Sequence, residues 1–327
     1  GDTGSSAIHG LRGKKGVECF ILFPDGRTSP IQERQMTTVL DSNIHNIALK
    51  GNFDDAQNIV KALFADLPFK KEYNLGAVNS INWARILAQT VYYVYAYLKV
   101  TDAGSTDKVS FSVPTGNFGD ILAGFYAKKM GLPVADLVVA TNENDILDRF
   151  FKTAKYSRNE CRETLSPSMD ITISSNFERF LYHMAGDDSK ALGDMMKTFE
   201  ATGSLEVDSK VVDKCKAEMK SSMVPDEEVL STIEEYEKKF GYVLDPHSAI
   251  GVAAANKVGT EAKKMVSLAC AHWGKFPVAV ERAVGSEAMK KLDVPDTLAQ
   301  LDTMETRKYP IEAETEAVRE FIVKQLS

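Results

Sequence analysis

The sequence predicts an α/β fold, in which helices cover a mostly parallel sheet. Strand-like apolar runs such as Val109–Val113 and Leu137–Ala140 alternate with helical patterns such as Ile121–Met130. The turns between them are short, which favours right-handed crossovers between parallel strands. The length of 327 residues is enough for two domains of ordinary size or one large domain.

The other expected elements continue this alternation along the chain. Near the start, Ser29 before Pro30 is typical of a helix N-cap with proline at the first helical position. The region from about Asp187 to Lys239 differs, because it is polar, helical in pattern and without a strand signal. We therefore expect a helical excursion from the sheet there. Further strands are expected at 17–23, 43–49 and 266–269, and further helices at 3–11, 56–65, 82–100, 145–151, 175–184 and 313–326.

Composition and charge argue against several classes of protein. The net charge of −7 argues against nucleic acid or an anionic membrane as a partner. No apolar run approaches the ~18 residues of a membrane span. The sequence contains neither a CxxC nor an HxxxH pair, so we expect no metal site and no disulfide framework. This pattern suits a reducing compartment, and we expect the cytoplasm, with a plastid as the alternative.

The strongest local motif is a glycine loop between a strand and a helix. The strand Val109–Val113 leads into Thr115-Gly116-Asn117-Phe118-Gly119-Asp120, and a helix follows. Glycines let the backbone approach a ligand, and the free N–H groups of a first helical turn attract an anion such as a phosphate. The loop matches neither a dinucleotide-binding nor a Walker fingerprint, and an ordinary strand-to-helix turn is the alternative. Asp120 opposes an anion unless its side chain faces away.

Three other stretches carry polar groups that could form a site. Asn79, Ser80 and Arg85 stand near a helix start and suit a phosphate or carboxylate, although an N-cap serine beside an unrelated arginine is the alternative. His247, in Leu244–Gly251, is interpreted as a structural histidine in the first turn of a helix.

The last of these three stretches, Ser267–Phe276, ends a strand with Cys270, His272 and Lys275 close together in the sequence. A cysteine nucleophile needs a histidine that is near it in space, and closeness in sequence does not supply one. We therefore do not expect a catalytic cysteine–histidine pair here.

Taken together, these stretches resemble the threonine synthase family, in the long-chain form of fungi and some bacteria. The resemblance covers essentially the whole chain in order and is poor only from about Asp187 to Lys239. The motifs that carry it are GDTGS, LRGKKGVECFILFPDGRTSPIQERQMTT, GNFDDAQ, GAVNSINWARILAQ, PTGNFGDILAGFYAKKMGLP, ATNENDILDRF, LSPSMDITISSNFERFLY and LDPHSAIGV.

The resemblance implies an α/β, pyridoxal-phosphate (PLP) dependent enzyme of fold type II, similar to the tryptophan synthase β-subunit. Such a protein has two domains of helix-covered sheets, with the cofactor in the cleft. Residues 1–75 would be the remainder of the smaller N-terminal domain. Residues 76–327 would form the larger, PLP-binding domain, with the helical excursion at about 187–240.

The resemblance also implies roles for individual residues. The substrate-binding set would be Thr3, Gly4 and Ser5 for the carboxylate, and Asn79, Ser80 and Arg85 for the phosphate. The cofactor-binding set would be Asp2 near the PLP 3′-oxygen, Thr115, Gly116, Asn117, Phe118 and Gly119 at the PLP phosphate, and Cys270 at the pyridine nitrogen. The family usually has threonine in place of Cys270. A thiol is a weak donor, so it should also leave that nitrogen largely unprotonated.

The family's lysine that forms a Schiff base with PLP lies in a Phe-Lys-Asp motif upstream of GDTGS. No such motif occurs here, and Phe69-Lys70 is followed by Lys71. Lysine suits this role because its amine can be deprotonated and condense with an aldehyde. We therefore expect no catalytic residue in this chain, and the lysine upstream of Gly1. The segment that carries it would be cleaved and present as a separate chain, unrecorded, or absent, and we expect this chain alone to be inactive.

The implied reaction converts O-phospho-L-homoserine and water to L-threonine and phosphate. One alternative is a related phospho-lyase that releases α-ketobutyrate. Another is a truncated, non-catalytic protein that acts through binding. The intact glycine loop and the intact Asn79–Arg85 stretch favour a part of an enzyme over a deliberately inactive protein.

Overall fold

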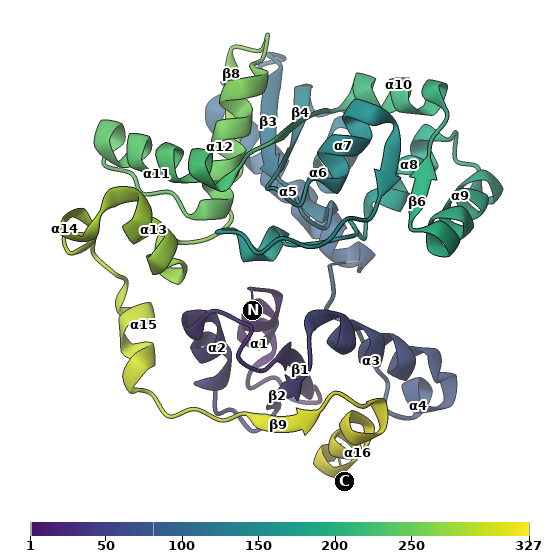
Figure 1. Cartoon of the computed structure of the whole chain (residues 1–327), viewed down its shortest axis with the longest axis vertical. Helices are drawn as coiled ribbons and strands as arrows, with labels where there is room; N and C mark the ends of the chain where they lie inside the picture. Colours follow the sequence, from purple (N-terminus) through teal and green to yellow (C-terminus); the bar gives the residue numbers. More distant parts are fainter. Residues whose placement is uncertain (1, 81, 327) are drawn as a thin grey trace. The chain divides into compact units, whose positions relative to one another are not determined.

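The computed structural model describes residues 2–80 and 82–326, and it divides into two compact units. Unit 1 contains the residues up to Asn79 together with those from Asp293 onward, and unit 2 contains Ser80–Leu292. The expected division was 1–75 and 76–327. The C-terminal residues group with unit 1 because one of their strands pairs in its sheet (Figure 1).

Unit 1 is built on a three-stranded parallel sheet in the order β1-β2-β9. Its strands are β1 (Cys19–Pro24), β2 (Ile44–Lys50) and β9 (Tyr309–Glu312). The central strand β2 is buried at every position except Lys50, as expected for a parallel strand covered on both faces. The helices of unit 1 are α1 (Asp2–Leu11), α2 (Pro30–Thr37), α3 (Phe53–Ala65), α4 (Leu67–Glu72), α15 (Asp296–Ala299), α16 (Thr315–Leu326) and the 3₁₀ helix η3 (Gln300–Thr303).

Unit 2 is built on a four-stranded parallel sheet in the order β7-β4-β3-β8. Its strands are β3 (Val109–Pro114), β4 (Val134–Thr141), β7 (Lys220–Met223) and β8 (Lys264–Ser267). The chain runs outward from β3 through β4 to β7, and then returns to place β8 on the other side of β3. The strand order therefore reverses between β3 and β8. Sheets of this kind bind ligands outside the carboxyl ends of the strands at such a reversal.

Helices and a short antiparallel strand pair complete unit 2. All six residues of β3 are buried in its core. Helices α5 and α6 approach closely at Gly124, where a Cβ would lie 2.5 Å from the Tyr93 ring. The helices are α5 (Trp83–Val100), α6 (Gly119–Lys129), α7 (Ile146–Thr153), α8 (Phe177–Met184), α9 (Ser189–Thr202), α10 (Ser209–Glu218), α11 (Asp226–Phe240), α12 (Pro246–Val258), α13 (Pro277–Val284) and α14 (Ser286–Met289), with the 3₁₀ helices η1 (Pro167–Met169) and η2 (Trp273–Lys275). The strand pair is β5 (Lys155–Ser157) with β6 (Ser204–Glu206).

The region from 187 to 240 is not entirely helical, contrary to the expectation. It contains helices α9, α10 and α11, but also β6 and the sheet strand β7. Strand β7 reads Lys-Ser-Ser-Met, which is short and polar, as edge strands often are, so it gives no apolar signal. Strand β9 was also not expected, because it contains Pro310, which strands tolerate at an edge.

Candidate functional site

Two loops of unit 2 start where the strand order of its sheet reverses, between β3 and β8. The loop that leaves β3 is the predicted glycine loop, Thr115–Gly119, and the segment that leaves β8 contains Cys270. Strands β3 and β8 are parallel and pair directly, with Ser112 opposite Ser267. Both loops therefore start from the same edge of the sheet, on neighbouring strands.

The glycine loop is fixed by its backbone and by one buried ring. The N–H of Thr115 donates to the Ala140 carbonyl oxygen at 2.7 Å. Phe118 has a left-handed φ of 61°, and its buried ring packs against Phe177 and Phe180. The ring therefore anchors the loop, and Phe118 offers a ligand only its backbone. Helix α6 begins at the next residue, and its first N–H groups have no partners within the helix.

A second segment, Ser174–Asn176, donates hydrogen bonds to backbone carbonyl oxygens of the glycine loop. Ser174 Oγ donates to the Gly116 carbonyl oxygen at 2.6 Å. The backbone N–H and the Nδ2 of Asn176 donate to the Asn117 carbonyl oxygen at 3.1 and 2.9 Å. A Cβ on Gly116 would lie 3.3 Å from Met169 Cα, so this close approach favours glycine. The sequence analysis missed Ser174 and Asn176, because no local pattern separates them from other polar loop residues.

Arg85 and Gln89 bring unsatisfied polar atoms to the glycine loop. They lie one turn apart on α5 and therefore on one face of the helix. Arg85 Nη1 and Gln89 Oε1 are buried and have no hydrogen-bond partner within residues 2–80 and 82–326. A Cβ on Gly119 would lie 3.7 Å from Gln89 Oε1 and 3.8 Å from the Ser80 carbonyl oxygen. A buried guanidinium nitrogen without a partner is typical of a site that an anion completes.

The start of helix α5 tests one of the two interpretations of Ser80, in which it is the N-cap of that helix. Its N-cap is Asn82, whose Oδ1 accepts the N–H of Ala84 at 3.0 Å. An N-cap role for Ser80 was therefore wrong. The Ser80 carbonyl oxygen instead accepts a bond from Asn176 Nδ2 at 3.1 Å, which ties this stretch to the segment that holds the glycine loop. Asn79 lies directly before it, as the last residue of the N-terminal part of unit 1.

Asp120 lies in the first turn of α6, with its side chain turned toward Tyr93. The Tyr93 hydroxyl donates to Asp120 Oδ1 at 3.0 Å. Burial raises the pKa of the Asp120 carboxyl to about 6, and the bond from Tyr93 opposes part of that rise. A carboxyl group that is engaged with Tyr93 opposes an anion at the glycine loop less than a free carboxylate would.

The predicted residues near the N-terminus are Asp2, Thr3, Gly4 and Ser5, all in the first turn of α1 in unit 1. The helix expected at 3–11 is confirmed, and it includes Thr3–Ser5, which the resemblance implied to be part of a loop. The Ser5 hydroxyl donates to the Asp2 carbonyl oxygen at 3.1 Å, and a Cβ on Gly4 would lie 2.7 Å from Met36 Sδ. The turn is thus closed and tightly packed. Its first N–H groups have no partners within the helix and suit a carboxylate.

Cys270 is exposed beyond the carboxyl end of β8. Its N–H donates to Ser248 Oγ at 2.9 Å, which fixes its backbone. Unit 2 thus places the glycine loop and Cys270 on neighbouring strand ends, and it brings the Ser80 stretch against Gly119.

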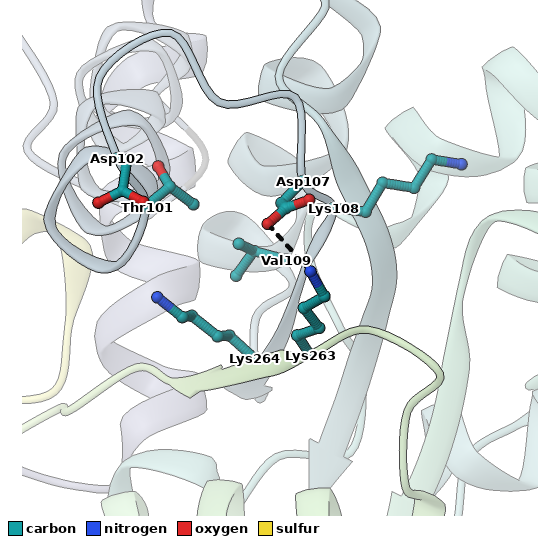
Figure 2. A pocket seen from close by; sticks show the side chains of 7 residues that line it. All are labelled: Thr101, Asp102, Asp107, Lys108, Val109, Lys263 and Lys264. Atoms are coloured by element: carbon teal, nitrogen blue, oxygen red, sulfur yellow. Dashed lines mark ion pairs between the residues drawn. The ribbon is translucent and has the colours of Figure 1, made fainter.

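Two pockets elsewhere in unit 2 contain none of the predicted site residues. One is small and lies at the amino ends of β3 and β8, where Lys263 Nζ faces Asp107 Oδ2 at 3.6 Å (Figure 2). The other has a volume of about 460 Å³ and lies beyond β4, with Asn144, Arg149 and Cys161 in its lining. Within the part of the chain that the structure describes, no group of three or more His, Cys, Asp or Glu side chains could hold a metal ion, and no helix has the length and apolar character of a membrane span.

Known proteins share this fold and much of this sequence. Residues 1–212 match the family described as pyridoxal-phosphate dependent enzyme, and residues 248–322 match the family described as threonine synthase, C-terminal. The chain is 46% identical to the threonine synthase of Saccharomyces cerevisiae over 349 residues, covering 100% of the chain and 68% of the relative. It is 48% identical to that of Pseudomonas aeruginosa, covering 98% of the chain and 68% of the relative. The crystal structure of PLP-bound threonine synthase from Brucella melitensis has a TM-score of 0.91 and 44% identity, covering 99% of this chain and 69% of that one.

Proposed function

The chain belongs to the threonine synthase family of PLP-dependent enzymes, and on this premise we propose which of its residues serve the reaction. Its fold is the PLP fold type II, and its cofactor is PLP. The proposed reaction is the conversion of O-phospho-L-homoserine and water to L-threonine and phosphate. The chain spans 68% of the length of the yeast relative, and the proposal concerns the protein to which these residues belong.

The observation that carries the proposal is a pair of buried polar atoms beside the glycine loop, Arg85 Nη1 and Gln89 Oε1, which have no hydrogen-bond partner among the described residues. Thr115–Gly119 would hold the PLP phosphate with backbone N–H groups and the start of α6, as the close approach at Gly116 permits. When bound, PLP supplies an electron sink for the carbanion that forms on the substrate. Cys270 would meet the pyridine nitrogen, and its weak donor group would leave that nitrogen largely unprotonated.

The substrate phosphate is proposed to bind at Asn79, Ser80 and Arg85. Support comes from the buried Nη1 of Arg85, which lacks a partner in the described ranges, and from the neighbouring Gln89. A guanidinium is suited to a phosphate because its planar N–H groups match the phosphate oxygens. For Asp2, Thr3, Gly4 and Ser5 we propose the roles that the resemblance implies, beside the PLP 3′-oxygen and at the substrate carboxylate. The first-turn N–H groups of α1 support the second role.

Proton transfers in this reaction are proposed to use a lysine amine that these residues do not provide. The sequence has no Phe-Lys-Asp motif, and about a third of the yeast relative lies outside the matched part. We propose that this outside part carries the lysine and that residues 1–327 alone do not complete the reaction. We further propose a reducing compartment, the cytoplasm, since Cys19, Cys161, Cys215 and Cys270 form no disulfide.

The proposal is tested by calorimetric titration of the protein with pyridoxamine 5′-phosphate, which needs no lysine to bind. Saturable binding is expected, and it should be lost in Gly116→Val, because the new side chain meets the Met169 backbone. Phosphate release from O-phospho-L-homoserine should appear only when the lysine-bearing segment is supplied together with PLP. A wild-type protein that does not bind pyridoxamine 5′-phosphate would contradict the proposed cofactor site.

A further inference from the structure

Asp245, His247 and Ser248 form a buried polar cluster to which the reaction assigns no role. Their exposed fractions are 1%, 3% and 4%. Asp245 is the N-cap of α12, and its Oδ1 accepts the backbone N–H of His247 at 2.9 Å. The same oxygen lies 2.9 Å from Nδ1 of the His247 ring. The cap alone would need only the backbone bonds, so the ring contact calls for a further explanation.

The His247 ring is held in one tautomer by partners on both nitrogens. The backbone N–H of Ser168 donates to His247 Nε2 at 3.2 Å, so this nitrogen is an acceptor and carries no proton. The proton of the neutral ring is therefore on Nδ1, which donates to Asp245. The ring of Phe276, 4.8 Å away between centroids, packs against the imidazole.

One arm of this cluster reaches the glycine loop. Ser168 and Met169 belong to the short helix η1, and this helix packs directly on Gly116. A Cβ on Gly116 would lie 3.3 Å from Met169 Cα and 3.4 Å from the Ser168 carbonyl oxygen. His247 therefore fixes, through the Ser168 N–H, the backbone that limits how the glycine loop can move.

The other arm reaches the segment after β8. Ser248 Oγ donates to Asp245 Oδ2 and accepts the N–H of Cys270 at 2.9 Å. The N–H of Ala271 donates to the same Asp245 oxygen at 3.3 Å. The Asp245 carboxylate is thus bonded to groups that hold both loops at the reversal point of the sheet.

We propose that Asp245 and His247 are positioning residues for the cofactor site, which fix the spacing between the glycine loop and Cys270. The inference rests on the proposed function, in which one ligand meets the first loop with its phosphate and the second with its ring. A site whose two ends are already at the right spacing binds such a ligand more tightly, because less ordering is needed on binding. A ligand that meets only one end gains little from that spacing.

The test uses three substitutions of His247 in the full 327-residue chain, with pyridoxamine 5′-phosphate and inorganic phosphate as probes. Gln places an oxygen near the position of Nε2 and keeps the acceptor for Ser168, whereas Asn keeps only the donor to Asp245, and Phe keeps neither. Affinity for pyridoxamine 5′-phosphate should fall about tenfold in His247→Phe and His247→Asn, as expected for one lost buried hydrogen bond, and should stay within about twofold in His247→Gln. Affinity for inorganic phosphate should change much less in every variant.

The matched control is His45→Phe in unit 1. His45 is also a buried histidine, 4% exposed, with Nε2 2.8 Å from Glu18 Oε2. Its substitution should leave both affinities unchanged. Thermal unfolding of each variant shows whether it is folded, and if His247→Phe does not fold, the contrast between the Asn and Gln variants decides.

Two results would overturn the inference while leaving the cofactor site intact. One is wild-type affinity for pyridoxamine 5′-phosphate in the folded Phe or Asn variant. The other is an equal loss of affinity for both probes, which would indicate general loosening of the glycine loop rather than loss of spacing. A wild-type protein that does not bind pyridoxamine 5′-phosphate would instead overturn the proposed function, and the inference with it.

Discussion

Two polar clusters of unit 2 lie at the proposed site, and they differ in whether their polar atoms are paired. Arg85 and Gln89 each bury a polar atom that has no partner among the described residues, whereas the Asp245 carboxylate accepts bonds from His247, Ser248 and Ala271. Buried polar groups are nearly always paired in folded proteins. We therefore attribute the unpaired cluster to the proposed ligand, and the paired one to the backbone segments that it connects. The substitutions of Asp245 and Arg85 below test this division, and that of Asp120 tests a third buried polar group, next to the glycine loop.

The largest effect is expected when the paired cluster loses its carboxylate. Asp245→Ala should lower the free energy of unfolding by about 4 kcal/mol, because several buried donors are left without an acceptor. Urea unfolding measures this. Asp188→Ala is the matched control, since Asp188 is also a helix N-cap, at α9, but is exposed, and its Oδ1 accepts the N–H groups of Lys190 and Ala191. Its loss should be about 1 kcal/mol. Equal losses would show that Asp245 is an ordinary cap.

A pH-dependent effect on stability is expected at Asp120. Its carboxyl accepts a hydrogen bond from Tyr93, but burial still makes its charged form unfavourable in the folded state. Its pKa rises from 3.8 to about 6 on folding, so the folded state holds the proton more tightly than the unfolded state. The resulting stabilisation is complete below pH 3.8 and is lost as the pH rises through about 6. Between these limits the wild type should lose roughly 3 kcal/mol relative to Asp120→Asn. Urea unfolding of both proteins across this range checks it, and parallel pH profiles would contradict it.

The smallest effect on stability, with a clear effect on binding, is expected at Arg85. Arg85→Met should leave the free energy of unfolding within about 0.5 kcal/mol or raise it, since it removes an unsatisfied buried group. With the glycine loop saturated by pyridoxamine 5′-phosphate, the binding free energy of inorganic phosphate should weaken by about 2 kcal/mol, the size of a hydrogen bond to a charged group. Arg149→Met is the control, because Arg149 is paired with Asp145 at 2.8 Å and should affect stability rather than phosphate binding. If Arg85→Met instead lowered stability and left phosphate binding unchanged, the distinction between the two clusters would be lost.

The sequence predicted the local structure of the candidate site where it depends on neighbours in the chain. The glycine loop could be predicted because a strand, a turn and a helix start follow one another within Val109–Gly119. The role of Asn176 could not, since it depends on a bond to a carbonyl oxygen far away in the sequence. The same limit applies to strand β7, whose four polar residues form a strand only because β4 is there to pair with them.

Gly4 shows the same limit in a helix that the sequence did predict. The expected helix at 3–11 contains Gly4, but glycine favours turns in isolation and the sequence gives no reason for it there. In the structure Gly4 is helical, and its missing side chain makes room for Met36 and Ile21. A local pattern cannot tell a glycine that turns the chain from one that lets other side chains approach.

Unit 1 is assembled from two stretches of the chain that unit 2 separates, and this affects how it can form on the ribosome. Strand β9 is synthesised long after β2, with the whole of unit 2 between them. At roughly 5–20 residues per second, the edge of β2 that β9 later covers stays bare for on the order of ten seconds or more. A bare strand edge can pair with an edge of another chain. Unit 2 is contiguous and can finish first, so the nascent protein is most exposed to misassembly at unit 1 until β9 emerges and pairs with β2.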